Sequence, residues 1–368
     1  MRHLTVFVCT FQEIIYFRHA TTILDQKDNK HRSISSSDAR FIFFFDRWSK
    51  IVKTPFCRLA TSISALLIMA TPAHAEANKA HLYFPADLQT ESRITLTPGF
   101  TPDGQTMFFA QSECSPIWKC PQRLKRSTRT AEGWTAPKRV DLPIDSRVDY
   151  PSVTPDGSTL LFSWMVTHPE RASDDTTGNF DLWQLDLTTP DARPQPLEGP
   201  DLNRVRAGAV KTLRFVNNET APNLTWAGDL YFWGERLDGV GDRDAYVARA
   251  DGTGGFLAPE LLPAPINSTK ADDGLWVSPD GKLMLITYSD RGGCGGSDLF
   301  QSRLIDGAWT EPVNLGCDIN SPFAEYAASM IPGTEQIVFP SDRPAAGTDK
   351  RDVQLWTAHL PELNLKDQ

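Results

Sequence analysis

The chain has 368 residues, of which 40% are hydrophobic and 23% charged, with a formal net charge of −9. The first 75 residues hold ten basic and five acidic side chains, so residues 76–368 carry 27 basic against 41 acidic ones. This excess of negative charge argues against nucleic acid or an anionic membrane as a partner. The absence of GxSxG, HExxH, phosphate-loop and dinucleotide motifs argues against the enzymes that depend on them.

The first part of the chain is predicted to be a targeting segment. Residues 51–75 have the pattern of a signal peptide, because basic residues precede an apolar stretch at 59–70 and Ala73-His74-Ala75 supplies a small-x-small cleavage site. We interpret residues 1–50 as a mis-annotated or disordered leader, with an authentic long leader as the alternative. Residues 76–368 are then a single exported domain, periplasmic or secreted, without membrane insertion after cleavage.

A four-residue phrase recurs along this domain, and its first residues are 53, 71, 53 and 53 positions apart. Proline presets the second turn position, aspartate bonds its own turn, and glycine takes a positive φ, so the phrase is typical of a strand-turn-strand unit. A repeat of this length in a strand-rich chain predicts a β-propeller. The copies, two of them degenerate, are Thr101-Pro102-Asp103-Gly104, Thr154-Pro155-Asp156-Gly157, Thr225-Trp226-Ala227-Gly228, Ser278-Pro279-Asp280-Gly281 and Ile331-Pro332-Gly333-Thr334.

Each unit has further strand signals after the phrase. A third strand begins with aspartate in four units, and a Pro-bearing edge strand follows, as at 133–137 and 308–312. The last unit lacks its outer strand, which residues 81–85 are expected to supply and so to close the ring. We therefore predict an all-β fold with five four-stranded blades, six being the alternative. The aspartates that begin third strands recur once per blade and are predicted to be structural: Asp181, Asp244, Asp298 and Asp352.

These repeats resemble the TolB-like propeller family, with WD-like repeats of the Ser/Thr-Pro-Asp-Gly type, over residues 80–360. The best stretch is Ser289–Phe300, followed by Trp309 and Pro312 and then by Asn314 and Leu315. The resemblance implies a periplasmic scaffold that binds envelope proteins through its ring face. This chain shows no separate N-terminal domain of the kind that the family's namesake carries, so that partner set does not transfer directly.

Four cysteines remain after the predicted cleavage. Cys114 and Cys120 share one loop, whereas Cys294 and Cys317 fall in two loops that a propeller places on the same face of one blade. We predict the disulfides 114–120 and 294–317, as expected in an oxidising compartment. A zinc site is the alternative, although paired CxxC spacing is absent.

The innermost strands are predicted to begin at the mouth of the central channel, with a carboxylate at one height in four blades. The functional interpretation is an acidic funnel that attracts a basic peptide, a cation or a polyhydroxylated ligand. The structural one is that these carboxylates bond backbone N–H groups. The predicted ligand- or partner-binding residues are Asp149, Tyr150, Glu219, Asp272, Asp273, Trp276, Glu325 and Tyr326.

The pattern favours a non-catalytic, monomeric scaffold that binds an envelope protein or peptide through this acidic ring face. The alternative is a carbohydrate-active hydrolase or lyase, for which Asp149, Asp272, Asp273 and Glu325 would supply the catalytic carboxylates. A glycan or small molecule is therefore a second class of ligand. No cofactor or metal is predicted, although the loop 238–244 has the alternating oxygen and glycine pattern of a weak calcium site.

Overall fold

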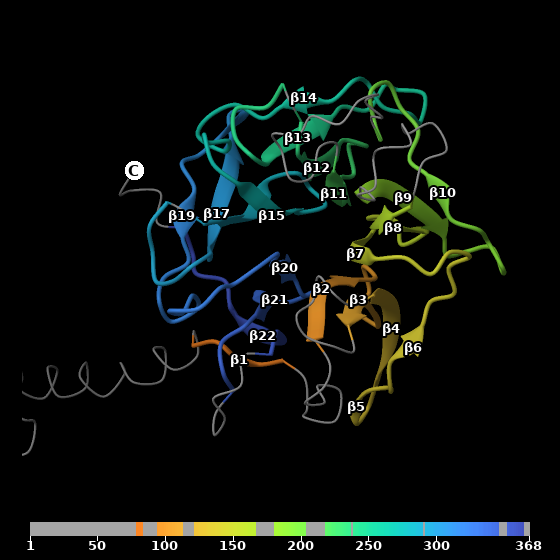
Figure 1. The fold of residues 1–368 in the computed structure, drawn as a ribbon, viewed down its shortest axis with the longest axis horizontal. Coiled ribbons are helices and arrows are strands. Elements are labelled where there is room, and N and C mark those ends of the chain that lie inside the picture. The colour runs from red at the N-terminus through yellow and green to blue at the C-terminus, as the bar shows by residue number, and fades with distance from the viewer. Residues whose placement is uncertain are drawn as a thin grey trace, which may run out of the picture. The chain divides into compact units, whose positions relative to one another are not determined.

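The computed structural model describes residues 79–83, 94–112, 121–166, 180–203, 218–236, 238–289, 291–345 and 352–363. These residues form β-strands without helices, in five antiparallel sheets (Figure 1). None of the described segments is a helix long and apolar enough to span a membrane. The predicted leader and signal peptide, residues 1–75, lie outside the described ranges.

The five sheets are the blades of a propeller, which confirms five blades and excludes the six-bladed alternative. Blade 1 consists of β2 (Ile94–Phe100), β3 (Thr106–Ser112), β4 (Gln122–Thr130), β5 (Gly133–Trp134) and β6 (Lys138–Arg139). Blade 2 consists of β7 (Val148–Val153), β8 (Thr159–Met165), β9 (Phe180–Asp186) and β10 (Gln195–Pro196). Blade 3 consists of β11 (Glu219–Leu224), β12 (Leu230–Gly234), β13 (Asp244–Ala248) and β14 (Glu260–Leu261).

The last two blades complete the ring. Blade 4 consists of β15 (Asp272–Val277), β16 (Leu283–Tyr288), β17 (Asp298–Ile305), β18 (Ala308–Trp309) and β19 (Val313–Asn314). Blade 5 consists of β20 (Ser329–Met330), β21 (Gln336–Ser341), β22 (Gln354–His359) and β1 (His81–Leu82). As predicted, β1 closes the ring by pairing with β22, with His81 opposite Thr357.

The turn phrase forms the hairpin between the first two strands of a blade. In blade 2 the N–H of Gly157 donates to the Thr154 carbonyl at 2.8 Å, and the Thr154 hydroxyl donates to Asp156 at 2.6 Å. Gly157 has a φ of +78°, which a side chain would disfavour. The phrase thus closes the hairpin as its residue types predict.

The innermost strands of four blades contain a β-bulge that the sequence did not indicate. The register of pairing shifts in the middle of β2, β7, β11 and β15. At the same repeat position in all five blades one residue has a positive φ, between 37° and 64°. A bulge bends its strand and increases the local twist, so the channel wall is reshaped at this level. The residues with a positive φ at this repeat position are Thr97, Tyr150, Ala221, Gly274 and Ala327.

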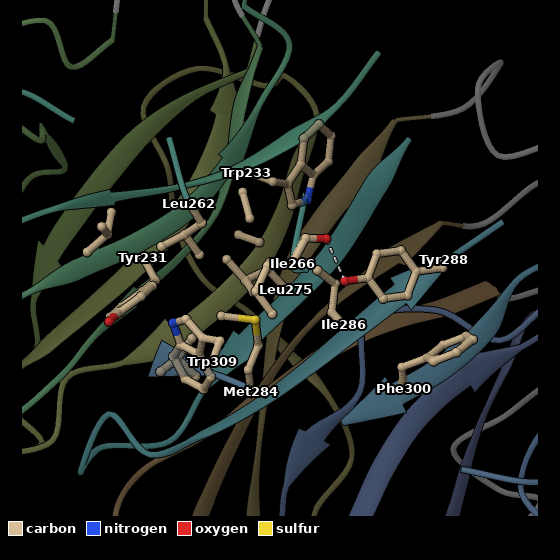
Figure 2. Packing of buried hydrophobic residues seen from close by; sticks show 14 residues of the cluster. Tyr231, Trp233, Leu262, Ile266, Leu275, Met284, Ile286, Tyr288, Phe300 and Trp309 are labelled. Atoms are coloured by element: carbon tan, nitrogen blue, oxygen red, sulfur yellow. Dashed lines mark hydrogen bonds between the residues drawn. The ribbon is translucent and has the colours of Figure 1, made fainter. Parts of the chain in front are cut away.

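The hydrophobic core lies between neighbouring blades. Between blades 3 and 4, Met284 and Ile286 of β16 pack with Tyr231 of β12, and Trp309 of the edge strand β18 covers the outer end (Figure 2). Trp309 is only 9% exposed, so its ring is packed against the two blades. Successive side chains of a strand point to opposite faces, so the fully buried strand β16 packs against blade 3 with one face and against blade 5 with the other.

Candidate functional site

The four predicted mouth carboxylates whose side chains are described are buried, and each belongs to a different blade. Glu219, Asp272 and Glu325 are 0% exposed, and Asp149 is 8% exposed. The Asp273 side chain lies outside the part of the structure that is described. The described carboxylates are therefore distributed around the ring and are not directed together into one pocket.

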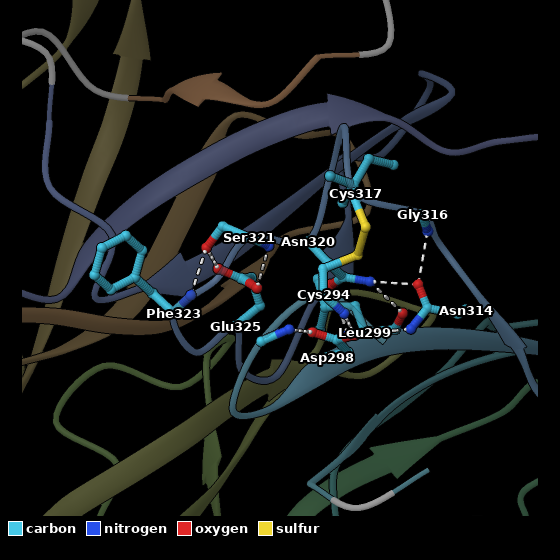
Figure 3. The surroundings of a disulfide bond; sticks show 12 residues. Cys294, Asp298, Leu299, Asn314, Gly316, Cys317, Asn320, Ser321, Phe323 and Glu325 are labelled. Carbon is cyan, nitrogen blue, oxygen red and sulfur yellow. Dashed lines mark hydrogen bonds between the residues drawn. A yellow bond between two sulfur atoms is a disulfide. The ribbon is translucent and has the colours of Figure 1, made fainter. Parts of the chain in front are cut away.

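Glu325 shows what such a carboxylate does. It accepts hydrogen bonds from the Ser321 N–H at 2.9 Å and from the Ser321 hydroxyl at 2.6 Å (Figure 3). The Ser341 hydroxyl donates a further bond to it at 2.7 Å. The Arg343 guanidinium lies 2.9 Å away and also donates to the Ile319 carbonyl. Carboxylate and arginine together therefore hold the loop that leads from blade 4 into blade 5.

Glu219 has a similar environment in blade 3. It accepts the Asn203 N–H at 2.7 Å and pairs with Arg236 at 2.6 Å, where both side chains are almost fully buried. Arg236 donates to the Asp201 carbonyl at 2.8 Å and lies 4.8 Å from the centre of the Tyr246 ring. The ion pair therefore binds the segment at Asp201 and Asn203 that precedes blade 3.

Asp272 completes this series in blade 4. It accepts the N–H and the hydroxyl of Ser268, the latter at 2.8 Å, while Arg291 donates to the carbonyls of Pro265 and Ile266 at 2.7 and 2.8 Å. Burial raises the pKa of the Asp272 carboxyl to about 6, against the opposing effect of the Ser268 bonds. Here the arginine and the carboxylate bind the same loop without a direct ion pair between them among the described contacts.

Sequence reasoning missed a buried asparagine in each of the three loops that these carboxylates hold. Asn203, Asn267 and Asn320 are buried, and the side-chain oxygen of each accepts an N–H from the third strand of the preceding blade. The signal was present as an apolar residue followed by asparagine at 202–203, 266–267 and 319–320. In three blades, the asparagine therefore bonds the loop to the preceding blade and the carboxylate bonds it to the next one.

Asp149 differs because it joins blades 1 and 2 through side chains. It accepts bonds from the Thr97 hydroxyl, from Gln122 Nε2 at 3.2 Å and from the Tyr150 N–H at 2.9 Å. Burial raises its pKa, and the Thr97 bond opposes that rise. In Asp149 and Asp272 alike, the main cause of the raised pKa is burial and not repulsion among acids.

The predicted disulfide between Cys294 and Cys317 is confirmed, with a Cα–Cα distance of 5.5 Å. It lies beside Asp298, which accepts the N–H groups of Cys294 and Gly295 at 2.6 and 3.1 Å (Figure 3). This bonding agrees with a structural role for the aspartate. Cys114 and Cys120 lie outside the described residues.

In the loop 238–244, which was considered for calcium, an aspartate likewise accepts backbone N–H groups. Asp244 accepts the N–H groups of Val240 and Gly241 at 3.1 and 3.2 Å. Burial is the main cause of its raised pKa. Within the described residues no group of three or more His, Cys, Asp or Glu side chains is arranged to hold a metal ion.

A cavity of about 340 Å³ lies in the central channel. It runs from the level of the bulges to the turn phrases and is lined by the innermost strands of all five blades. Tyr150 and Trp276, two of the predicted binding residues, line it, whereas Tyr326 is not part of this wall. No charged side chain is among the described residues of the wall.

The turn phrases surround one end of this channel with apolar residues. Four prolines and Trp226 line the cavity there, and Trp226 is 67% exposed. Trp226 occupies the position of proline in the degenerate phrase of blade 3. That departure from the repeat was visible in the sequence and marks a candidate contact residue. The prolines are Pro102, Pro155, Pro279 and Pro332.

No protein-family model and no curated protein matches the chain. TolB from Acinetobacter baumannii aligns with 73% of this chain and 54% of its own length, at 15% identity and a TM-score of 0.39. The chain thus spans about half of that protein. An α-L-arabinofuranosidase from Lactobacillus brevis aligns with 74% of this chain and 92% of its own length, at 13% identity and a TM-score of 0.47. A protein of unknown function from Dyadobacter fermentans aligns with 76% of this chain and 98% of its own length, at 13% identity and a TM-score of 0.43.

Proposed function

We propose that this chain is an exported, non-catalytic propeller scaffold that binds a protein or peptide of the cell envelope through the ring. The contact surface we propose is the central channel at its turn-phrase end. Proteins commonly bind ligands in concave, mostly apolar sites with a few polar groups. The predicted acidic face offers less, because its described carboxylates already accept bonds from the protein and are shielded from solvent.

The observation that carries this proposal is the composition of the channel wall. Its described residues include Tyr150, Trp276 and Trp226 and no charged group. Aromatic residues are enriched at the centres of protein interfaces, where charged residues are depleted. A partner would therefore gain most by placing an uncharged side chain in the channel.

The disulfide between Cys294 and Cys317 supports export, because such bonds persist mainly in oxidising compartments. The predicted signal peptide at 51–75 gives the same localisation, periplasmic or secreted. A carbohydrate-active enzyme would need two carboxyl groups on either side of a glycosidic bond. No carboxylate is among the described residues of the channel wall, so no observation favours that alternative.

The test is affinity capture from an envelope extract with three baits expressed from the full reading frame. Ser152, which is partly buried on the channel wall, is changed to Phe in one bait to fill the channel. Asp149→Asn alters the acidic ring in another, and thermal melting verifies that all three baits are folded. A stoichiometric partner that is lost only with Ser152→Phe is the expected result. Loss only with Asp149→Asn would return the contact to the acidic face, and equal capture by all three would contradict both surfaces.

A further inference from the structure

The turn of blade 3 departs from the other four in length as well as in residue type. The N–H of Thr225 donates to the Asp229 carbonyl, four residues on, whereas the matching bond spans five residues in the other phrases, as from Thr154 to Thr159. Trp226 also donates its N–H to the Pro279 carbonyl of blade 4 at 2.8 Å, which proline could not do. The turn is thus fixed by a bond to blade 4 while its indole stays exposed.

A groove of about 820 Å³ lies where this shortened turn faces blade 2. Leu161, Gln184 and Pro196 line it from three strands of blade 2, and Trp226 and Phe256 line it from blade 3. The groove adjoins the central channel, because Trp226 forms part of both walls. Phe256 is partly buried, so the two rings offer apolar surface beside polar side chains.

The groove is acidic, unlike the channel. Asp156 and Glu198 line it and are exposed, and no cationic side chain is among its described lining residues. The Thr154 hydroxyl and the Ser158 N–H hold the pKa of Asp156 below its ordinary value, so it is ionised at neutral pH. Arg249, near the Gly228 end, already pairs with Asp229 at 2.7 Å. The charge of the groove therefore complements a cation.

The outer edge of blade 2 limits how a chain could bind here. Pro196 of β10 has no N–H, and Pro194 precedes it by two residues. An incoming segment therefore cannot extend the sheet by a regular ladder of backbone bonds. Recognition must come from side chains that meet the two aromatic rings and the two carboxylates.

We propose that the groove between blades 2 and 3 binds an extended peptide segment in which Lys or Arg stands next to a large apolar residue. The apolar side chain packs on Trp226 and Phe256, and the cation lies beside Asp156 and Glu198. This inference rests on the proposed scaffold function and adds the chemistry of the partner. Tryptophan is among the residues that most often dominate binding energy at interfaces, and charge complementarity adds specificity and a faster association rate.

The experiment selects binders from a random dodecapeptide library displayed on phage, with the protein expressed from the full reading frame. The strongest peptide is then synthesised, and its Kd is measured by fluorescence anisotropy. We expect enriched peptides to pair Lys or Arg with a neighbouring apolar residue. Trp226→Ala should weaken binding by about tenfold or more. Asp156→Asn combined with Glu198→Gln should weaken it several-fold and reduce its salt dependence.

Asp103→Asn is the matched control. Asp103 occupies the same position in the turn of blade 1, and the Thr101 hydroxyl donates to it at 2.6 Å, as Thr154 does to Asp156, but it does not line the groove. This variant should bind the peptide like the unchanged protein. A Kd that responds equally to Asp103→Asn and Asp156→Asn would overturn the proposal, as would enrichment of acidic peptides or no enrichment.

A channel variant separates this proposal from the scaffold function on which it rests. Loss of binding in Ser152→Phe alone would support the channel and overturn the groove. Loss in the double variant Asp156→Asn and Glu198→Gln, without loss in Ser152→Phe, would support the groove and contradict the channel as the contact surface, because these two carboxylates line the groove alone. An oligosaccharide array probed in parallel covers the remaining class, because a glycan that binds through Trp226 in place of any peptide would overturn the peptide assignment.

Discussion

The two ends of the ring use polar groups in opposite ways. At the end where the innermost strands begin, Glu219, Asp272 and Glu325 are buried and hold the loops between blades. At the turn-phrase end the carboxylates of Asp103 and Asp156 are exposed, and an uncharged channel lies between them and the other turns. Charge therefore holds the blades together at one end and remains available for contact at the other. The predictions below test this division.

The largest effect is expected for Arg236→Ala at the strand-start end. The substitution leaves Glu219 buried without the guanidinium 2.6 Å away, and breaking a buried pair in this way costs about 3–5 kcal/mol of unfolding free energy. Denaturant unfolding of both proteins measures it. Arg249→Ala is the control, because Arg249 is 45% exposed in its pair with Asp229, and a pair at the surface is worth at most about 1 kcal/mol. Equal losses in the two variants would contradict the division between the ends.

The disulfide at the same end is expected to contribute slightly less. Cys294 and Cys317 are 23 residues apart, and closing a loop of that size in the unfolded chain stabilises the fold by about 3 kcal/mol. The double substitution Cys294→Ala and Cys317→Ala should lower the unfolding free energy by that amount. Adding reductant should destabilise the unchanged protein more than the variant, in which only the predicted 114–120 disulfide is left to reduce. A reductant effect on the variant would mean that another disulfide contributes.

The fold could be predicted because its evidence is local. Three turn phrases combine proline and glycine at fixed positions, the two degenerate copies keep the spacing, and apolar runs follow each phrase, so blade number and hairpins can be read from spacing. The closure by His81–Leu82 followed from the missing outer strand of the last unit, and the pairing of Cys294 with Cys317 followed from their loops.

The candidate site could be predicted only in part. Thr97, Tyr150 and Ala327 take a positive φ at the same repeat position, although their residue types do not favour it, so no sequence signal indicated them. The burial of Glu219 depends on Arg236 and Asn203, which come from other segments of the chain. The sequence alone does not show whether a carboxylate at a strand start is paired with a distant arginine or is hydrated by solvent.

A pH dependence should come from the strand-start end. The pKa of Asp272 in the fold is about 6, above its ordinary value of 3.8, so the folded protein holds a proton that the unfolded chain has lost between about pH 4 and 6. The stability that this provides is present below about pH 4 and is lost as pH rises through 6. Asp272→Asn removes the titration, so the melting temperature of the unchanged protein should fall relative to the variant over this range.

The control for this prediction lies at the turn-phrase end. The pKa of Asp156 is lowered, so what its charge contributes is already present at pH 4. The difference in melting temperature between the unchanged protein and Asp156→Asn should therefore stay constant from about pH 4 to 7. If the profiles of Asp272→Asn and of the unchanged protein run parallel, Asp272 does not titrate as its burial requires.

The smallest effect on stability is expected for Trp226→Ala at the turn-phrase end. The indole is 67% exposed, and alanine keeps the N–H that donates to the Pro279 carbonyl, so the unfolding free energy should change by no more than about 0.5 kcal/mol. Denaturant unfolding measures this, and Trp309→Ala, which removes a ring packed between blades 3 and 4, should instead cost about 3–5 kcal/mol. If the exposed ring adds as little to stability as expected, it is available for contact with a partner, which its place between channel and groove supports. A cost for Trp226→Ala close to that of Trp309→Ala would make the ring a structural residue and remove the distinction between the two ends.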